Sequence, residues 1–389
     1  MNKIKLVEDT IDRSDIDHLV KWLVGAKDVP RLTKGPLTIK LEEKWSDWLG
    51  VDNSVFCNSG SSANLLMLWA LVESKRVKKD CKVVVPAISW ATDLSPVIQL
   101  GMRPILCDCN MDDLSIDLDE FYKIAKDENP DVLILVSVLG LVPNMDKILD
   151  ICREFNIILL EDTCESMGSK FQNKKLGTFG LMSSFSTYFG HHISTIEGGF
   201  VSTNDEEIYE IVKCIRSHGW TRDSSESFML EKKEKWSTND FDLLYRFYYS
   251  GFNLRSTDLQ AFIGLGQIDK LNHICKKRNE NFALYDAELQ TISPKIRQTE
   301  GDFISNFAYP IVSENRQQII ENLQQNNIEV RPLICGSMGH QPFYVEKYGR
   351  KSMKNADLVN QYGLYVPNHQ KLSRSDVKRV SKSIREALK

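Results

Sequence analysis

The sequence predicts an α/β protein, in which a large domain with a mostly parallel sheet flanked by helices precedes a smaller C-terminal α+β domain. Two observations support this fold class. Short apolar runs alternate with helical patterns through about the first 210 residues, which is typical of parallel strands joined by helical crossovers. The chain also has 389 residues, which is long for one compact domain. We expect the two domains to span residues 1–250 and 251–389.

Five runs rich in β-branched residues are predicted strands, because their nearly continuous apolarity suits strands covered on both faces. In chain order they lie at 54–59, 82–87, 103–109, 131–139 and 157–163. Helical patterns lie between them, at 62–76 and 147–155. A polar, turn-rich stretch at 222–250 is expected to form a long surface excursion. The helix predicted at 258–288 is long enough to connect two domains, and mixed strand and helix patterns follow it.

The composition excludes several classes of protein. The formal net charge is −4 and 26% of residues are charged, with both signs interspersed, so nucleic acid would meet no broad positive field. No apolar run reaches the roughly 18 residues of a membrane span, and the first residues lack the apolar segment of a secretory signal. Nine cysteines include Cys107 and Cys109, without a second pair at zinc spacing. We expect reduced core thiols in a cytoplasmic protein.

Two strand ends carry residues that suit a planar ligand with a phosphate group. Gly60 and Ser61 open a helix directly after a predicted strand, where small residues let backbone N–H groups approach an anion. The alternative is an ordinary capped helix start. Trp90 follows the next predicted strand, at the end where α/β sites are built. It either stacks on a planar cofactor or belongs to the core.

Polar side chains also follow the later strands. Asp162 ends an apolar run, and a carboxylate that enters a buried site needs a cationic partner, such as a protonated pyridine nitrogen. The alternative is an Asp that caps the next helix. Glu165 is three residues further on and close enough to serve the same site, and Ser186 is a candidate for a phosphate contact.

Two consecutive histidines, His191 and His192, lie shortly after Ser186. Neighbouring residues do not normally point the same way, so the pair alone predicts one surface His and one packing His. No third ligand stands at metal spacing, so we predict no metal site.

In this order, the segments resemble the pyridoxal phosphate-dependent sugar aminotransferases of fold type I, which act on nucleotide-linked keto-sugars. The family pattern combines a small-residue phosphate turn, an aromatic stacker and an E-D-x-x-[QE] strand end. A G-T-F-G turn, an F-S-x-x-x-x-K-x-x-x-x-x-E-G-G segment and a later N-x-R complete the pattern, and the resemblance covers essentially the whole chain. Each motif is weak alone, but the combination is highly specific.

One position departs from the family pattern. Counted back from E-G-G, the lysine that binds the cofactor is replaced by His191. This replacement resembles the keto-sugar 3-dehydratases, and implies that L-glutamate converts pyridoxal 5′-phosphate to pyridoxamine 5′-phosphate. The implied reaction removes the C3 hydroxyl of a nucleotide-linked 4-keto-6-deoxy sugar, nearest to GDP-4-keto-6-deoxy-D-mannose, and releases 2-oxoglutarate and ammonia. His191 would be the catalytic acid and base, since its imidazole titrates near neutral pH.

Three alternatives to this function are open from the sequence. A related dehydratase of CDP-sugars shares the His but holds an iron–sulfur cluster on clustered cysteines. Residues 215–274 contain no Cys, so we expect neither an iron–sulfur cluster nor a reductase partner. The second alternative is a nucleotide-sugar 4-aminotransferase that works through bound pyridoxamine phosphate. The third is a non-catalytic ligand-binding relative, which would have no need of a complete cofactor site.

The resemblance also implies roles for individual residues. Those that match its cofactor-binding motifs are Gly60, Ser61, Trp90, Asp162, Glu165, Ser186 and Asn253. Asn253 is expected to reach the phosphate bound by a neighbouring subunit, which implies a homodimer with shared active sites. Arginine pairs bidentately with phosphate and carboxylate groups. The candidates for contacts with the nucleotide-linked keto-sugar or with glutamate are His218, Arg222, Arg255 and Arg331.

Overall fold

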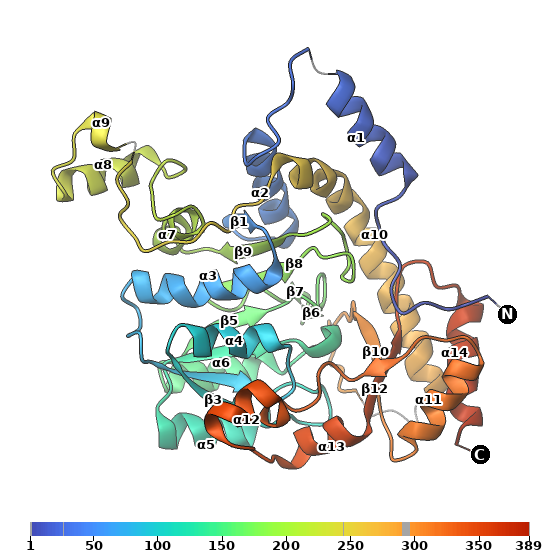
Figure 1. The fold of residues 1–389 in the computed structure, drawn as a ribbon. Helices are drawn as coiled ribbons and strands as arrows, with labels where there is room; N and C mark the ends of the chain where they lie inside the picture. The colour runs from blue at the N-terminus through green and yellow to red at the C-terminus, as the bar shows by residue number, and fades with distance from the viewer. Residues whose placement is uncertain (1, 26, 244, 290–295, 389) are drawn as a thin grey trace.

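A computed structural model of the chain describes residues 2–25, 27–243, 245–289 and 296–388. A seven-stranded sheet forms the centre of the larger part of the molecule, in the order β1-β9-β8-β5-β4-β2-β3 (Figure 1). Its strands are β1 (Asn53–Cys57), β2 (Lys82–Pro86), β3 (Arg103–Cys107), β4 (Val132–Val136), β5 (Ile158–Asp162), β8 (Met182–Ser186) and β9 (Gly199–Thr203). All neighbours from β3 to β8 pair in parallel, and β9 runs antiparallel to β8 and β1. The prediction of a mostly parallel sheet is confirmed.

Helices cover this sheet. Every residue of β4, β8 and β9 is buried, so both faces of these strands are covered, as their apolar pattern predicts for β4. The helices of the large part are α1 (Arg13–Gly25), α2 (Pro36–Leu49), α3 (Gly60–Glu73), α4 (Ala91–Gln99), α5 (Leu118–Glu128), α6 (Met145–Glu154), α7 (Glu206–Arg216) and the short 3-10 helix η1 (Val138–Gly140). A two-stranded hairpin, β6 (Lys170–Phe171) with β7 (Lys174–Lys175), extends from the loop after β5.

The C-terminal part has an antiparallel sheet of three strands, in the order β10-β12-β11. Its elements are β10 (Ala308–Val312), α11 (Arg316–Gln325), β11 (Arg331–Pro332), η2 (Met338–His340), α12 (Pro342–Tyr348), α13 (Lys354–Tyr362), β12 (Gly363–Pro367) and α14 (Arg374–Glu386). Helix α10 (Asp258–Leu289) packs on α2 and on α14, and so connects the two parts, as predicted for 258–288 (Figure 1).

The first residues cross over to the C-terminal part. Ile4 forms a parallel bridge with Ile328, and its amide donates to the carbonyl of Asn327 at 2.9 Å. The proposed division of the chain near residue 250 therefore separates the two sheets, while the N-terminal arm packs with the smaller one.

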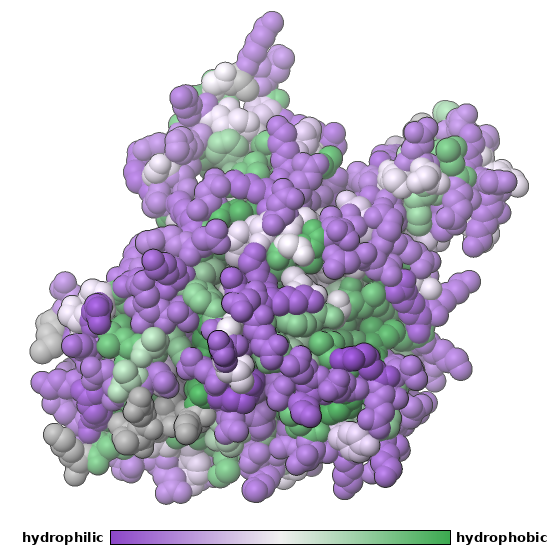
Figure 2. Space-filling view, turned by 180° about the vertical axis from the view of Figure 1, so that it is seen from behind, coloured by the Kyte–Doolittle hydropathy of each residue, from purple (hydrophilic) through white to green (hydrophobic). Residues whose placement is uncertain are grey.

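The polar stretch at 222–250 forms an excursion that stands clear of the body, as does the segment around α1 (Figure 2). It is not merely turns, because it contains α8 (Glu226–Lys235) and α9 (Asp240–Leu243). Within the described part of the chain, no helix has the length and apolar character needed to cross a bilayer.

Candidate active site

A cavity of about 630 Å³ lies at the carboxyl ends of the parallel strands. Because β1, β2, β5 and β8 run in the same direction, the segments that follow them meet at one edge of the sheet. Eight of the residues predicted from the sequence line this cavity: Gly60, Ser61, Trp90, Asp162, Glu165, Ser186, His191 and Arg331.

The turn at Gly60 is a capped helix start, and it also faces the cavity as a phosphate-binding turn would. Ser59 caps α3, since its hydroxyl accepts the Ser62 amide at 3.1 Å. Gly60 and Ser61 are the next residues, and both face the cavity at the positive end of the helix. A Cβ atom at position 60 would lie 2.6 Å from the Cβ of Ser186. Only glycine lets Ser186 approach the turn this closely.

Trp90 is not a core residue. Its side chain is 56% exposed and lies at the cavity wall, directly before α4. A flat ring held at this position is available to stack on a planar ligand. The interpretation of Trp90 as a core side chain is wrong.

Asp162 ends β5 inside the cavity. Its Oδ1 accepts the Cys164 amide at 2.9 Å, and its Oδ2 accepts the side-chain amide of Asn64 at 2.7 Å. No helix begins after it, because residues 163–169 form turns. The helix-capping alternative is therefore wrong, and the carboxyl group is held in place from the protein side.

Glu165 lines the same cavity. Its Oε2 accepts the backbone amide of Leu139 at 2.7 Å. Burial raises the pKa of the Glu165 carboxyl to about 8, and the nearby charge of Asp162 adds to this effect. At neutral pH Glu165 is therefore mostly a neutral acid that can donate a hydrogen bond to a ligand.

The two histidines have separate environments. His192 is fully buried, and its Nε2 contacts the carbonyl and hydroxyl oxygens of Ser305 at 2.8 and 3.0 Å. It is the packing histidine of the pair. His191 lines the cavity, with its ring 5.4 Å from the ring of Phe307, and its buried Nδ1 has no hydrogen-bond partner among the described residues.

The electrostatics of the cavity keep His191 neutral. Desolvation lowers the pKa of its imidazole to about 4, the negative charge of Asp162 opposes this, and the positive charge of Arg278 adds to it. Arg278 is also 3.3 Å from the His191 carbonyl through its Nη2. The expectation that His191 titrates near neutral pH is therefore wrong for the protein without its cofactor, in which the imidazole is held in the unprotonated form that can accept a proton.

Four predicted residues lie outside the lining of this cavity and gather around Trp220. The His218 ring is 5.2 Å from the Trp220 ring, and the Arg222 and Arg255 guanidinium groups lie 4.1 and 6.0 Å above it. The Nε of Arg255 donates to the Oδ1 of Asn253 at 3.1 Å. The structure thus divides the predicted ligands into a cavity set and this second set.

The second set is nevertheless close to the end of β1. The Asn58 amide donates to the Leu254 carbonyl at 3.0 Å, which places the segment with Asn253 beside the strand that leads into the Gly60 turn.

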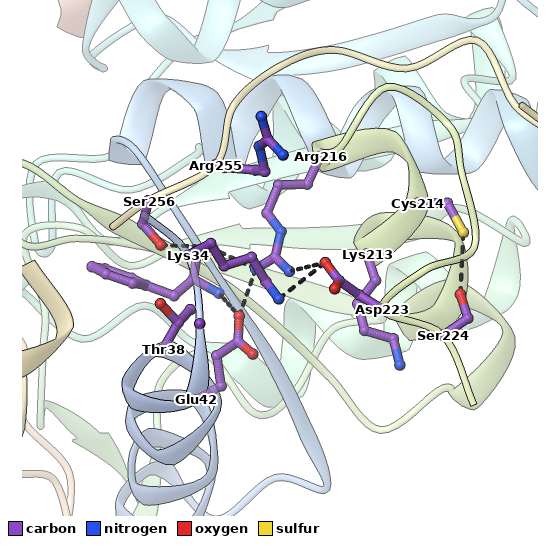
Figure 3. Close-up of polar contacts among 12 residues, drawn as sticks. Lys34, Thr38, Glu42, Lys213, Cys214, Arg216, Asp223, Ser224, Arg255 and Ser256 are labelled. Atoms are coloured by element: carbon purple, nitrogen blue, oxygen red, sulfur yellow. Dashed lines mark hydrogen bonds and ion pairs between the residues drawn. The ribbon is translucent and has the colours of Figure 1, made fainter. Parts of the chain in front are cut away.

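Ion pairs hold the segment that carries this second set, and the pair of Arg216 with Glu42 is buried (Figure 3). The Nη1 of Arg216 is 2.5 Å from Glu42, its Nη2 is 3.7 Å from Asp223, and the Nζ of Lys34 is 3.0 Å from Asp223. Two positive and two negative charges balance in this network. Arg255 points away from these pairs in Figure 3, so the network positions the loop without engaging that arginine.

The sequence did not reveal all polar residues at the cavity. Asp93 lines it and Asn64 contacts Asp162 from α3, but neither was predicted. The W-A-T-D stretch could have indicated Asp93, because an acid three residues after the residue that precedes a helix often accepts that residue's backbone amide. Asn64 had no such signal. In the described residues, no group of three or more His, Cys, Asp or Glu side chains is arranged to hold a metal ion.

Comparisons with known proteins agree with this geometry. The chain is 35% identical over 364 residues to GDP-4-keto-6-deoxy-D-mannose 3-dehydratase of Escherichia coli O55:H7, covering 90% of this chain and 92% of that protein. It is 32% identical over 381 residues to the enzyme of the same name from Yersinia pseudotuberculosis, covering 95% of both.

Solved structures give the same picture. The Escherichia coli enzyme with bound hydrated PLP superposes with a TM-score of 0.87 at 30% identity, over 99% of both chains. A structure of GDP-4-keto-6-deoxymannose-3-dehydratase with a trapped PLP-glutamate geminal diamine also has a TM-score of 0.87 at 30% identity, over 98% of this chain and 100% of that one.

The family model described as the DegT/DnrJ/EryC1/StrS aminotransferase family matches residues 13–385. The fold, the cavity at the strand ends and these likenesses agree over almost the whole length. The chain belongs to the DegT/DnrJ/EryC1/StrS aminotransferase family.

Proposed function

We propose that this chain is a pyridoxal phosphate-dependent 3-dehydratase that removes the C3 hydroxyl of GDP-4-keto-6-deoxy-D-mannose, with L-glutamate as the amino donor. The observation that carries the proposal is His191. It stands where the family pattern has its Schiff-base lysine, and it faces the cavity as a neutral imidazole. Relatives at 35% and 32% identity bear the name of this dehydratase.

The residues at the cavity fit this cofactor. Asp162 offers a carboxylate to the ring nitrogen, and none of its described contacts is a cation. The exposed face of Trp90 suits stacking on the ring, and the close approach of Gly60 to Ser186 leaves a small-residue turn for the phosphate. The neutral Glu165 can donate to an oxygen of the ring.

When bound, the cofactor in its amine form supplies an electron sink through its protonated ring nitrogen. Asp162 maintains that charge by pairing with the nitrogen. His191 accepts a proton from the reacting carbon and, once charged, donates it to the oxygen that leaves from C3 of the sugar. One imidazole can perform both transfers because the proton that it gains is the one that it returns.

The absence of a lysine at position 191 bears on which product forms. A lysine amine at position 191 would bind the aldehyde form of the cofactor covalently and favour return of the amino group to the sugar. Imidazole forms no such bond, so the cofactor is retained by non-covalent contacts, among them those with the turn, the Trp90 face and Asp162. We propose that this is why the chain dehydrates the sugar rather than aminating it.

A homodimer with shared active sites is part of the proposal. Its support is the second set of predicted ligands, which lies outside the cavity of its own chain. The excursion near this set also exposes large apolar side chains, which are typical of a surface that meets another protein. They are Leu230, Trp236, Phe241, Tyr245 and Phe247. Two-fold pairing would let each subunit offer the same groups to its partner.

The cytoplasmic location and the absence of an iron–sulfur cluster and reductase stay predictions. All nine cysteines are free, which agrees with a reducing compartment.

The proposed function is tested by product analysis. Purified protein is incubated with pyridoxal phosphate, L-glutamate and GDP-4-keto-6-deoxy-D-mannose, and the nucleotide sugars are followed by mass spectrometry. We expect a 3-deoxy-4-keto sugar together with ammonia and 2-oxoglutarate. A 4-amino sugar as the main product would support the aminotransferase instead. CDP- and dTDP-linked sugars in parallel reactions test the preference for GDP.

A further inference from the structure

A second carboxyl group lies against Asp162 at the floor of the cavity. Asp93 is fully buried and Asp162 is 6% exposed, and their side chains are in hydrogen-bond contact. The amide Nδ2 of Asn64 donates to both, at 3.2 Å to the Oδ1 of Asp93 and at 2.7 Å to the Oδ2 of Asp162. Two carboxyl groups therefore share one small polar site inside the protein.

Such a contact requires a proton. Two ionised carboxylates have only acceptor oxygens, so they cannot hydrogen-bond to each other, and their repulsion is strong in a buried site. The described contacts of Asp93 are the Trp90 amide, the Asn64 amide and Asp162, and none of them is a cation. One member of the pair is therefore a neutral acid that donates to the other.

The geometry indicates which member holds the proton. Asp162 accepts its two N–H donors at 2.7 and 2.9 Å, which favours the ionised form. Asp93 accepts its own two at the longer distances of 3.2 and 3.1 Å. Burial raises the pKa of Asp93 well above its ordinary value, and the charge of Asp162 raises it further.

The other titratable groups near Asp93 add no opposite charge. Burial raises the pKa of Glu165 to about 8, that of Cys335 to about 12, and that of the Cys164 thiol well above its ordinary value. All three are mainly neutral at pH 7. The floor of the cavity thus carries a single negative charge, on Asp162, which matches the single positive charge of a pyridinium ring.

Asp93 also holds the aromatic wall of the cavity. Its Oδ2 accepts the backbone amide of Trp90, the residue before α4, at 3.1 Å. One side chain therefore contacts both the residue proposed to lie over the face of the cofactor ring and the residue proposed to bind its nitrogen.

We propose that Asp93 is a neutral carboxylic acid and a positioning residue, which donates a hydrogen bond to Asp162 and fixes Trp90 for the cofactor ring. The proposal rests on the cofactor roles of Asp162 and Trp90 proposed above. It assigns Asp93 no contact with the substrate. Its function is to keep the single negative charge of the Asp162 carboxylate in a fixed orientation beneath the cofactor ring.

The test compares Asp93→Asn with Asp93→Ala. The Asn amide is neutral, can donate to Asp162 and can accept the Trp90 amide, so it replaces the contacts of a protonated Asp93 with these two residues. Alanine replaces neither. We expect the Asn variant to bind pyridoxamine phosphate within about three-fold of the wild-type affinity, and the Ala variant to bind it at least about ten-fold more weakly. Equilibrium dialysis measures the affinity without any turnover.

A second measurement reports the proton itself. The infrared difference spectrum of cofactor-free wild type minus Asp93→Asn at pH 7 should contain the carbonyl band of a protonated carboxyl group. Asp113→Asn is the matched control for burial, since Asp113 is 3% exposed and lies outside the cavity lining. Its cofactor affinity should equal that of the wild type. Circular dichroism establishes that each variant is folded.

Two results would overturn the proposal. One is a difference spectrum with only the bands of an ionised carboxylate. The other is a folded Asn variant that loses as much affinity as the Ala variant, because it would mean that Asp93 acts through a charge. A wild-type protein that binds the cofactor with the expected variant pattern but makes no 3-deoxy sugar would instead refute the proposed function and leave the role of Asp93 intact.

Discussion

The titration of His191 gives the sharpest test of its proposed role. Burial lowers the pKa of its imidazole from 6.5 to about 4. Burial disfavours the charged imidazolium of His191. The neutral imidazole is therefore populated above about pH 4 and is lost only as the pH falls through that value. The shift corresponds to about 3 kcal/mol against protonation in the folded protein. At pH 5.5 an ordinary histidine would be about 90% protonated, but His191 only about 3%.

The assay is NMR of protein with carbon-13 at the Cε1 atoms of histidine, titrated from about pH 8 to about pH 3, a range that includes the expected midpoint of His191. The chain has 7 histidines, and His191→Gln identifies the signal by its loss. In Asp162→Asn the carboxylate that favours the imidazolium is gone, so the pKa of His191 should fall further. A His191 signal with a midpoint near 6.5 in the wild type would refute the argument that this site keeps the base neutral.

Three further predictions concern the cofactor site. Asp162→Asn should reduce dehydration by roughly a hundred-fold or more, because an amide cannot hold the ring nitrogen charged; near-normal turnover in a single-turnover assay would exclude that pairing. Gly60→Ala should weaken pyridoxamine phosphate binding, because the new Cβ would lie 2.6 Å from the Cβ of Ser186; unchanged affinity by dialysis would mean that the turn does not hold the phosphate. Coexpression of Asn253→Ala and His191→Asn chains, each nearly inactive alone, should restore up to about a quarter of wild-type activity if sites are shared. Verified heterodimers without recovered activity would place Asn253 in its own subunit's site.

Most of the fold follows from the sequence alone. Continuous apolar runs such as β4 can be buried on both faces only inside a layered α/β domain, so their alternation with helices predicts the parallel sheet. β8 was not predicted as a strand, because its sequence MSSFS has the composition of an exposed segment. Its serines are buried by neighbouring strands, and Ser183 is satisfied by the carbonyl of Gly177 at 2.7 Å. Only the tertiary structure provides that partner.

The same division holds for the active site. The order of the motifs determined which residues reach the cavity, since parallel strands deliver their carboxyl ends to one edge and the residues that follow them must meet there. The sequence also determined that an imidazole replaces an amine at position 191. The tertiary structure decided the protonation of the site, because burial and the distances between Asp93, Asp162 and Asn64 are properties of the packed protein. It also decided that Arg255 joins His218 and Arg222 at Trp220 rather than lying with Arg331 in the cavity, because a contact between segments 35 residues apart has no local signal.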